Sequence, residues 1–289
     1  MSSSKKKMVI LYGKGGTADC GRHAVEVALL RNIDEVLVLT QYPELLEETN
    51  WNCACPGGHS LSEDRRKRLN VVKVDDNWEG NTKELVEHFH NATYVISALG
   101  NREPWKELEH DWVANVGTTA VVQAMKQANN CTKRIVIMSS VGVNEDWPPM
   151  ENIPWNAGKY TMMGMVFMTM GSTSYKDMCA MEKSVIKEAE DDELDYLFVR
   201  PVGIGPGAVP VNEWVIQKKK YEELTGYNVA KLDVARFCVK EAMEPTYSRQ
   251  GVVIASKLSP ELTTYYQKYK YFHPGFWLSK AKRDAMNSA

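Results

Sequence analysis

The sequence of 289 residues lacks any apolar run close to the roughly 18 residues that a membrane-spanning helix needs. A signal peptide is also missing, because the first seven residues are polar or basic after Met1 and include no apolar core. We therefore expect a cytoplasmic protein with no membrane span, in which residues 1–7 form a disordered basic tail.

A surplus of charge of one sign is missing as well. The chain has 35 Lys and Arg residues against 37 Asp and Glu residues, which leaves a net charge of −2 at pH 7. Proteins that bind the phosphate backbone of DNA or RNA usually carry a basic excess. We therefore expect no nucleic-acid partner.

Cysteine is scarce and scattered. Only Cys53 and Cys55 lie close together, and although His59 follows them, no second pair of ligands stands at the spacing of a zinc site. A chain of this length can bury a core without disulfides. The sequence therefore predicts reduced thiols and no metal site.

The sequence does contain short apolar runs that alternate with longer amphipathic stretches. The runs cover residues 8–12, 36–39, 71–74, 94–98, 134–138, 196–199 and 252–254. Unbroken apolar strands are typical of a parallel sheet covered on both faces, and residues 113–127 and 175–189 are predicted helices. The sequence predicts one α/β domain over residues 8–289, with a Rossmann-type, doubly wound, mostly parallel sheet and a small C-terminal substrate or lid region.

Two stretches interrupt this alternation. Residues 51–66 are rich in Gly, Pro and charged residues and are predicted to be a surface insertion. Residues 146–174 hold three prolines and a cluster of methionines. Because methionine is flexible, this segment could line an adaptable pocket or lid, or form a helix packed into the core. We assign 146–174 and 205–248 as lid or substrate elements.

A glycine-rich loop follows the first predicted strand and leads into a helix. Glycines there let backbone N–H groups and the positive end of the helix approach a pyrophosphate. The spacing from Gly13 to Gly16 to Gly21 is wider by two residues than the usual pattern, so a tight turn without a ligand is the alternative. We predict a phosphate-binding loop.

The second predicted strand is followed by Thr40 and Gln41 instead of an acidic residue. An acid there would bind the adenosine ribose hydroxyls and repel the 2′-phosphate of NADP. Lys14 and Arg22, in the glycine loop, could meet that phosphate or remain solvated surface charges. The balance favours NADP over NAD. Asp75, after the third strand, could touch the adenine or serve only in a turn.

Seven pieces of the sequence follow one another in an order that is specific to one superfamily. They are the glycine loop, Asp75, and the segments 95–100, 115–118, 134–143, 194–201 and 232–237. Together they resemble the atypical short-chain dehydrogenase/reductase group, and within it the NmrA-like and biliverdin-reductase-B-like NAD(P)-binding proteins. The resemblance spans most of the chain.

The resemblance implies that the ends of the fourth and fifth strands flank the nicotinamide and that Arg200-Pro201 begins a loop covering it. The predicted cofactor-binding residues are Gly13, Gly15, Gly16, Thr17, Gly21, Arg22, Thr40, Asp75, Ala98, Leu99, Gly100, Asn101, Pro201 and Ile204.

The Tyr-x-x-x-Lys pair of typical short-chain reductases is absent, because Cys179 follows Tyr175 at that spacing. Lys176 is adjacent to Tyr175, and neighbours in a helix point about 100° apart. The hydroxyls of Ser139 and Ser140 could hold a substrate carbonyl or only satisfy nearby backbone groups. The predicted catalytic residues are Ser139, Ser140, Tyr175 and Lys176.

Two functions fit these residues. The first is an NAD(P)H-dependent reductase that transfers a hydride to a small or flat apolar carbonyl or quinone-like substrate. The second, which NmrA-like relatives imply, is a non-catalytic NAD(P)-binding redox sensor or an assembly protein whose partner surface depends on the cofactor. The expected partner is accordingly a small molecule or another protein, and the chain is expected to be a monomer or a homodimer.

Overall fold

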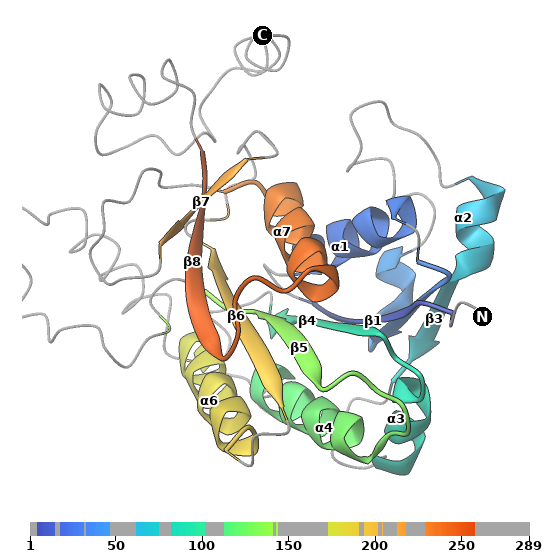
Figure 1. The fold of residues 1–289 in the computed structure, drawn as a ribbon, viewed down its shortest axis with the longest axis horizontal. Coiled ribbons are helices and arrows are strands. Elements are labelled where there is room, and N and C mark those ends of the chain that lie inside the picture. Colours follow the sequence, from blue (N-terminus) through green and yellow to red (C-terminus); the bar gives the residue numbers. More distant parts are fainter. Residues whose placement is uncertain are drawn as a thin grey trace, which may run out of the picture.

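Strands and helices alternate along the part of the chain that the computed structural model describes (Figure 1). This part comprises residues 5–14, 18–31, 33–46, 62–74, 82–101, 113–140, 143, 173–190, 194–201, 204, 213–217 and 229–257. The strands are β1 (Lys7–Lys14), β2 (Glu35–Thr40), β3 (Leu69–Lys73), β4 (Tyr94–Asn101), β5 (Arg134–Met138), β6 (Asp195–Pro201), β7 (Trp214–Gln217) and β8 (Gln250–Ser256). The helices are α1 (Ala18–Leu30), α2 (Glu63–Arg68), α3 (Thr82–Phe89), α4 (Val113–Gln127), α6 (Thr173–Glu188) and α7 (Lys231–Met243), with a 3-10 turn, η1, at Pro43–Leu46.

The eight described strands join one sheet in the order β3-β2-β1-β4-β5-β6-β8-β7. Neighbouring strands run parallel except at the edge of the sheet, where β7 pairs antiparallel with β8. The first six positions have the usual strand order of a doubly wound, dinucleotide-binding sheet. The predicted fold class, α/β with a Rossmann-type and mostly parallel sheet, is therefore confirmed.

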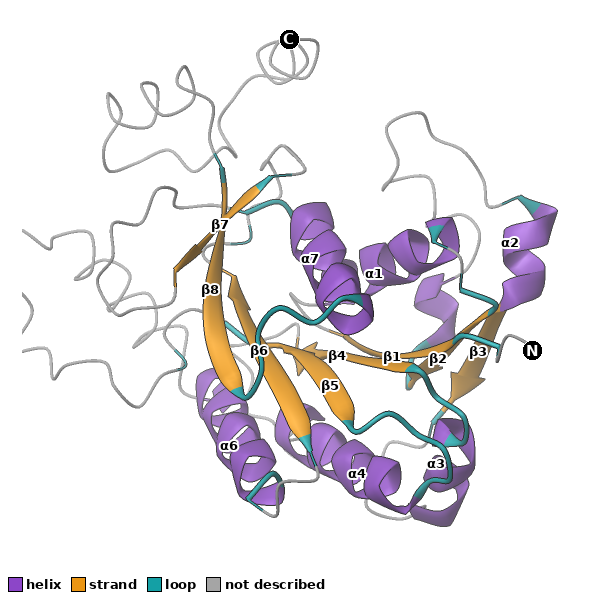
Figure 2. Cartoon of the chain, in the orientation of Figure 1, coloured by secondary structure: helices purple, strands orange, loops and turns teal. Residues whose placement is uncertain are grey.

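Helices cover the sheet on both faces (Figure 2). On one face α1 and α7 pack together over alternate residues of β1, including Met8 and Ile10. On the other face α3, α4 and α6 pack over the residues between them, including Val9 and Leu11. Because successive strand residues point to opposite faces, this double cover explains why the strands are apolar without alternation.

A carboxylate on α6 caps the first turn of α4. The backbone N–H groups of Ala114 and Asn115 donate to the two carboxylate oxygens of buried Asp177, each over 2.9 Å. These N–H groups have no partner within their own helix. Burial raises the pKa of Asp177, while the two backbone hydrogen bonds act in the opposite direction. The cap ties α4 to α6 at the end of the helices that lies nearest the carboxyl ends of the strands.

The segments that interrupt the predicted alternation are described only in part. Helix α2 begins at Glu63, inside the predicted insertion, whereas residues 51–61 lie outside the described residues. Residues 146–172 of the first predicted lid segment also lie outside them. Within the second, 205–248, strand β7 was not predicted, and α7 packs on α1 in the core. The domain boundaries stay a prediction.

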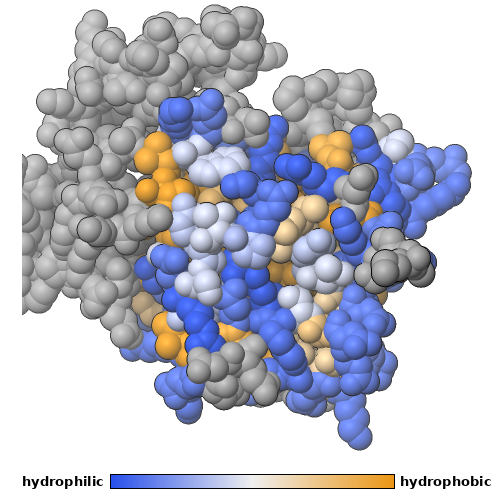
Figure 3. All heavy atoms as spheres, in the orientation of Figure 1, coloured by the Kyte–Doolittle hydropathy of each residue, from blue (hydrophilic) through white to orange (hydrophobic). Residues whose placement is uncertain are grey.

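No helix among the described residues is long and apolar enough to span a membrane. Figure 3 shows one face of the molecule, on which hydrophilic residues predominate and the hydrophobic areas are small and separate. Among the residues that the structure describes, the exposed large hydrophobic side chains are Leu30 and Ile186. They belong to α1 and α6, which cover opposite faces of the sheet, so they do not form one patch.

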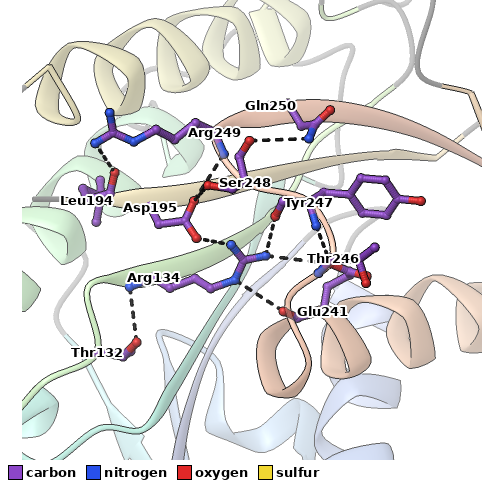
Figure 4. Close-up of polar contacts among 10 residues, drawn as sticks. All are labelled: Thr132, Arg134, Leu194, Asp195, Glu241, Thr246, Tyr247, Ser248, Arg249 and Gln250. Atoms are coloured by element: carbon purple, nitrogen blue, oxygen red, sulfur yellow. Dashed lines mark hydrogen bonds and ion pairs between the residues drawn. The ribbon is translucent and has the colours of Figure 1, made fainter. Parts of the chain in front are cut away.

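The amino ends of β5 and β6 are joined to α7 through the guanidinium of Arg134 (Figure 4). Arg134 forms an ion pair with Asp195 and donates from Nε to the carbonyl of Glu241 over 3.3 Å and from Nη2 to the carbonyl of Tyr247 over 2.7 Å. The carboxylate of Glu241 is fully buried and lies 3.8 Å from Nη2 of Arg134. This cluster lies at the edge of the sheet opposite the carboxyl ends of the strands.

Replacing Arg134 with methionine is expected to lower the free energy of unfolding by about 3–5 kcal/mol, because it leaves the buried carboxylate of Glu241 without its cation. Urea unfolding followed by circular dichroism measures the change. The control is Lys257→Met, which removes an exposed ion pair to Glu213 and should cause no measurable loss. Equal stability of the Arg134 variant and the wild type would contradict this role.

Candidate cofactor-binding site

The order of the strands reverses between β1 and β4. These neighbours run parallel, with Met8 opposite Tyr94 and Tyr12 opposite Ala98. From β1 the chain continues to β2 and β3 on one side, and from β4 it continues to β5 and β6 on the other. In open α/β sheets, ligands bind outside the carboxyl ends of the strands at such a reversal. The candidate site therefore lies beyond the ends of β1 and β4.

The end of β1 touches the end of β4 without space for a side chain. A Cβ atom on Gly13 would lie 2.8 Å from the backbone N and 3.0 Å from the backbone O of Gly100. The pairing of the two strands also shifts register between Tyr12 and Lys14. Only glycine at position 13 permits this approach, which sets the point where the chain leaves β1.

The first turn of α1 lies just as close to the same two strands. A Cβ on Gly21 would lie 2.8 Å from Cδ2 of Tyr12 on β1 and 3.0 Å from Cβ of Ala98 on β4. Close packing of helix on strand is the part that the third glycine plays in a dinucleotide-binding loop. The positive end of the α1 dipole thereby lies at the strand reversal, where it favours an anion.

The guanidinium of Arg22 has an unsatisfied donor next to this turn. Its Nε is buried and has no hydrogen-bond partner among the described residues. A buried charged donor without an acceptor is unfavourable by an amount comparable to a lost charge-assisted hydrogen bond. An anionic group bound beside the first turns of α1 would satisfy it. Gly15, Gly16 and Thr17 lie outside the described residues.

The end of β2 presents a hydroxyl that the backbone already uses. Thr40 is fully buried, and its Oγ1 accepts a hydrogen bond from the N–H of Tyr42 over 3.0 Å. Its carbonyl accepts one from the N–H of Val74 over 2.9 Å, which holds the segment after β3 against the end of β2. Asp75 is the next residue and lies outside the described part of the chain.

The predicted residues of β4 divide between the core and the edge of the sheet. Ala98 and Leu99 are buried on opposite faces, Gly100 is half-buried against Gly13, and Asn101 ends the strand. The strand thus runs three residues beyond the predicted 94–98. Ser97 is buried too, with Oγ 3.2 Å from Oγ1 of Thr118 on α4.

Ser139 and Ser140 follow β5 in different surroundings. Ser139 is buried, and its hydroxyl donates to Oε1 of Glu182 on α6 over 2.7 Å. Arg200, at the end of β6, donates from Nε to the same oxygen over 3.0 Å and forms an ion pair through its second terminal nitrogen with Oε2. Ser140 is half-buried. The proton of Ser139 is therefore committed to Glu182.

Tyr175 stands seven positions before Glu182 on α6. Because seven residues make almost two helical turns, the two positions share a face of the helix and lie roughly 10 Å apart along its axis. Helix α6 runs opposite to the strands, so position 175 lies beyond their carboxyl ends. The side chain of Tyr175 is outside the described part of the structure, whereas that of Lys176 is exposed.

Pro201 and Ile204 are the predicted cofactor-binding residues at and after the end of β6. Pro201 is buried at the end of β6, where it pairs with Ile254 of β8. Ile204 is half-buried and packs against the core on the α1 and α7 face. The described residues contain no group of three or more His, Cys, Asp or Glu side chains that could hold a metal, and Cys53, Cys55 and His59 lie outside them.

Comparison with known families agrees with this geometry. A family described as NAD(P)H-binding matches residues 15–245. The chain belongs to this NAD(P)H-binding family. No curated protein matches the chain.

Solved structures share the fold of this family member at low sequence identity. A candidate epimerase from Bacteroides thetaiotaomicron is 16% identical, with a TM-score of 0.59 over 88% of this chain and 98% of that one. A short-chain dehydrogenase/reductase from Veillonella parvula, solved in complex with NADP, is 12% identical, with a TM-score of 0.58 over 89% and 96%. A candidate NADH-flavin reductase from Streptococcus pneumoniae is 14% identical, with a TM-score of 0.55 over 87% and 100%.

Glu182 is a residue at the strand ends of this NAD(P)H-binding protein that was not predicted from the sequence. It contacts residues 43 and 18 positions away in the chain, Ser139 and Arg200. Glu182 could have been predicted from two features of the sequence: it lies on the same helical face as Tyr175, and Arg200, a possible ion-pair partner, precedes Pro201. The roles of the predicted site residues stay predictions.

Replacing Gly13 with alanine is expected to destabilise the protein by about 1–3 kcal/mol, because the new Cβ would overlap backbone atoms of Gly100, which have no rotamer to change. Urea unfolding checks this change. Gly251→Ala is the comparison variant: the atoms nearest to its Cβ would belong to the guanidinium of Arg200, a side chain that can be displaced, whereas the backbone of Gly100 cannot. An equal loss for both variants would count against a special constraint at Gly13.

Proposed function

We propose that this NAD(P)H-binding protein is a reductase of the atypical short-chain dehydrogenase type, akin to NmrA-like and biliverdin-reductase-B-like proteins. Its proposed substrate is a small or flat apolar carbonyl or a quinone-like compound. The observation that supports the cofactor's position is the contact of Gly13 with Gly100 beneath the first turn of α1. The nicotinamide, when bound, supplies the hydride. The chain supplies binding, orientation and a proton.

The proposed cofactor is NADP in preference to NAD. No carboxylate directly follows β2, where Thr40 is buried and bonded to backbone. The buried Nε of Arg22, which has no hydrogen-bond partner among the described residues, suits a phosphate, and the similar protein from Veillonella parvula was solved with NADP. An arginine donor and a missing acid both favour a 2′-phosphate.

Replacing Arg22 with alanine is expected to weaken NADPH binding about 10- to 100-fold, which corresponds to the roughly 1.5–3 kcal/mol of a charge-assisted hydrogen bond. NADH binding should change little, because NADH lacks the 2′-phosphate. Isothermal titration with both cofactors measures the difference. The control is Arg31→Ala, which removes an exposed arginine just after the other end of α1. Equal weakening for NADPH and NADH would mean that Arg22 does not select the 2′-phosphate.

The proposed proton donor is Tyr175. Its position on the same face of α6 as Glu182, and beyond the carboxyl ends of β5 and β6, supports this choice. Lys176 is exposed one position away, where helical neighbours diverge by about 100°. The hydroxyl of Ser139 is buried and donates to Glu182. We propose that Ser140, which follows it after the end of β5, holds the substrate carbonyl.

Replacing Tyr175 with phenylalanine is expected to lower kcat about 10²- to 10⁴-fold with unchanged NADPH affinity, because the phenol proton is removed while the ring remains. Steady-state NADPH oxidation with quinones, flavins and aldehydes as acceptors provides the assay. Tyr94→Phe, the same change at the start of β4 and thus at the opposite edge of the sheet, is the control. Full activity of the Tyr175 variant would assign the proton to another group or to water.

A second function has its own support. Cys179 stands where typical reductases carry lysine, and the proton of Ser139 is held by Glu182. Both features suit a non-catalytic NAD(P)-binding redox sensor or assembly protein, acting as a monomer or homodimer on a protein partner. The same acceptor panel separates the two functions: tight NADPH binding without oxidation by any acceptor favours the sensor.

A further inference from the structure

Glu182 accepts hydrogen bonds from side chains at the ends of two strands, β5 and β6. Its side chain is 7% exposed, and its carboxylate accepts from the hydroxyl of Ser139 after β5 and from the guanidinium of Arg200 at the end of β6. The N–H of Ser139 also donates to the carbonyl of Val199 over 2.8 Å. One side chain on α6 thus holds the ends of two neighbouring strands.

Arg200 is itself held from the other side by β8. A Cβ on Gly251 would lie 2.5 Å from Cζ, 2.6 Å from Nη1 and 2.9 Å from Nε of Arg200. The guanidinium therefore occupies the space above Gly251, and only a glycine leaves that space open. Over Gly251, the guanidinium faces the carboxylate of Glu182 with two of its nitrogens.

Each strand-end residue of this cluster directly precedes a residue predicted to lie beside the nicotinamide. Ser139 precedes Ser140, and Arg200 precedes Pro201. Buried ion pairs contribute little net stability compared with apolar packing, and their best-supported use is to specify one arrangement. A displacement of about 1 Å in a reacting geometry is enough to change rates about a hundredfold.

We propose that Glu182, held by Arg200 over Gly251, is a positioning residue that fixes Ser140 and Pro201 against the bound nicotinamide. This proposal rests on the proposed function, because it requires a nicotinamide at the ends of β5 and β6. It does not involve the adenosine and phosphate half of the cofactor, which the proposed site places at β1, β2 and α1. Losing the cluster should therefore disturb the nicotinamide ring and leave the affinity for the whole cofactor nearly unchanged.

The test is Glu182→Gln, with NADPH as the probe. Glutamine keeps the size of the side chain but removes its charge and turns one acceptor into a donor facing Arg200. We expect the Kd of NADPH to stay within about threefold of the wild type. The fluorescence lifetime of bound NADPH should shorten, because a looser nicotinamide loses excitation faster, and kcat with any acceptor that the wild type reduces should fall about 10- to 100-fold.

Glu188→Gln is the matched control. It makes the same substitution on the same helix and removes the ion pair between Glu188 and Lys126 of α4. Glu188 is the last residue of α6, at the end of the helix away from the carboxyl ends of the strands. NADPH bound to this variant should keep the wild-type lifetime. Gly251→Ala is the second test variant: it should displace the guanidinium of Arg200 without removing a charge, and it should shorten the lifetime as Glu182→Gln does. It carries the test if Glu182→Gln does not fold.

The outcomes separate the two proposals. Failure of the wild type to bind NADPH would overturn the proposed function and the positioning role together. Binding by the wild type with no turnover would overturn the reductase alone, since the lifetimes still report on the nicotinamide. Unchanged lifetimes in Glu182→Gln and Gly251→Ala, or an equal shortening in Glu188→Gln, would overturn the positioning role alone.

Discussion

Two glycine contacts bring β1, β4 and α1 closer together than any side chain would allow. Gly13 lies against the backbone of Gly100, and Gly21 lies against Tyr12 and Ala98. A Cβ at position 13 would push the two strand ends apart, and one at position 21 would lift the helix from the sheet. The positive end of α1 stands over the reversal of strand order because both positions are glycine. The location of the candidate cofactor site depends on these contacts.

The rest of the packing holds the carboxyl ends of the other strands beside the reversal of strand order. Each face of the sheet has its own buried apolar cluster, one beneath α1 and α7 and the other beneath α3, α4 and α6. Two polar clusters then act at opposite edges. Arg134 joins β5, β6 and α7 at the amino ends, and Glu182 joins β5, β6 and α6 at the carboxyl ends. The first stabilises the fold, whereas the second lies where the proposed chemistry occurs.

The sequence predicted seven of the eight described strands from short apolar runs of three to five residues. Such runs arise because most of these strands are buried on both faces, although the edge strand β3 is not. The sequence analysis missed β7, which has only four residues and is recognisable as a strand chiefly by its antiparallel pairing with β8. It also missed α2, whose six residues, EDRRKR, contain no apolar periodicity and no buried side chain. Local sequence patterns identify elements that have an apolar face. They do not identify elements such as β7, which form by pairing with another strand.

The same reasoning separates the parts of the site. The glycines lie in the loop directly after the first strand, and the other predicted residues lie at the ends of strands. Both kinds of position could therefore be predicted from local patterns in the sequence. Glu182 was missed because a glutamate within a polar helix has the pattern of a surface residue. Its burial arises only when β5 and β6 bring Ser139 and Arg200 beside it. Gly251 was missed for the same reason, since its requirement comes from a side chain on another strand.

A crystal structure of the protein grown with saturating NADP⁺ tests the central claim most directly. The account predicts density for the pyrophosphate at the first turn of α1, above Gly13 and Gly21, and for the nicotinamide beside Ser140 and Pro201. Density for the cofactor at any other edge of the sheet, or none in crystals of protein saturated with the cofactor, would contradict it.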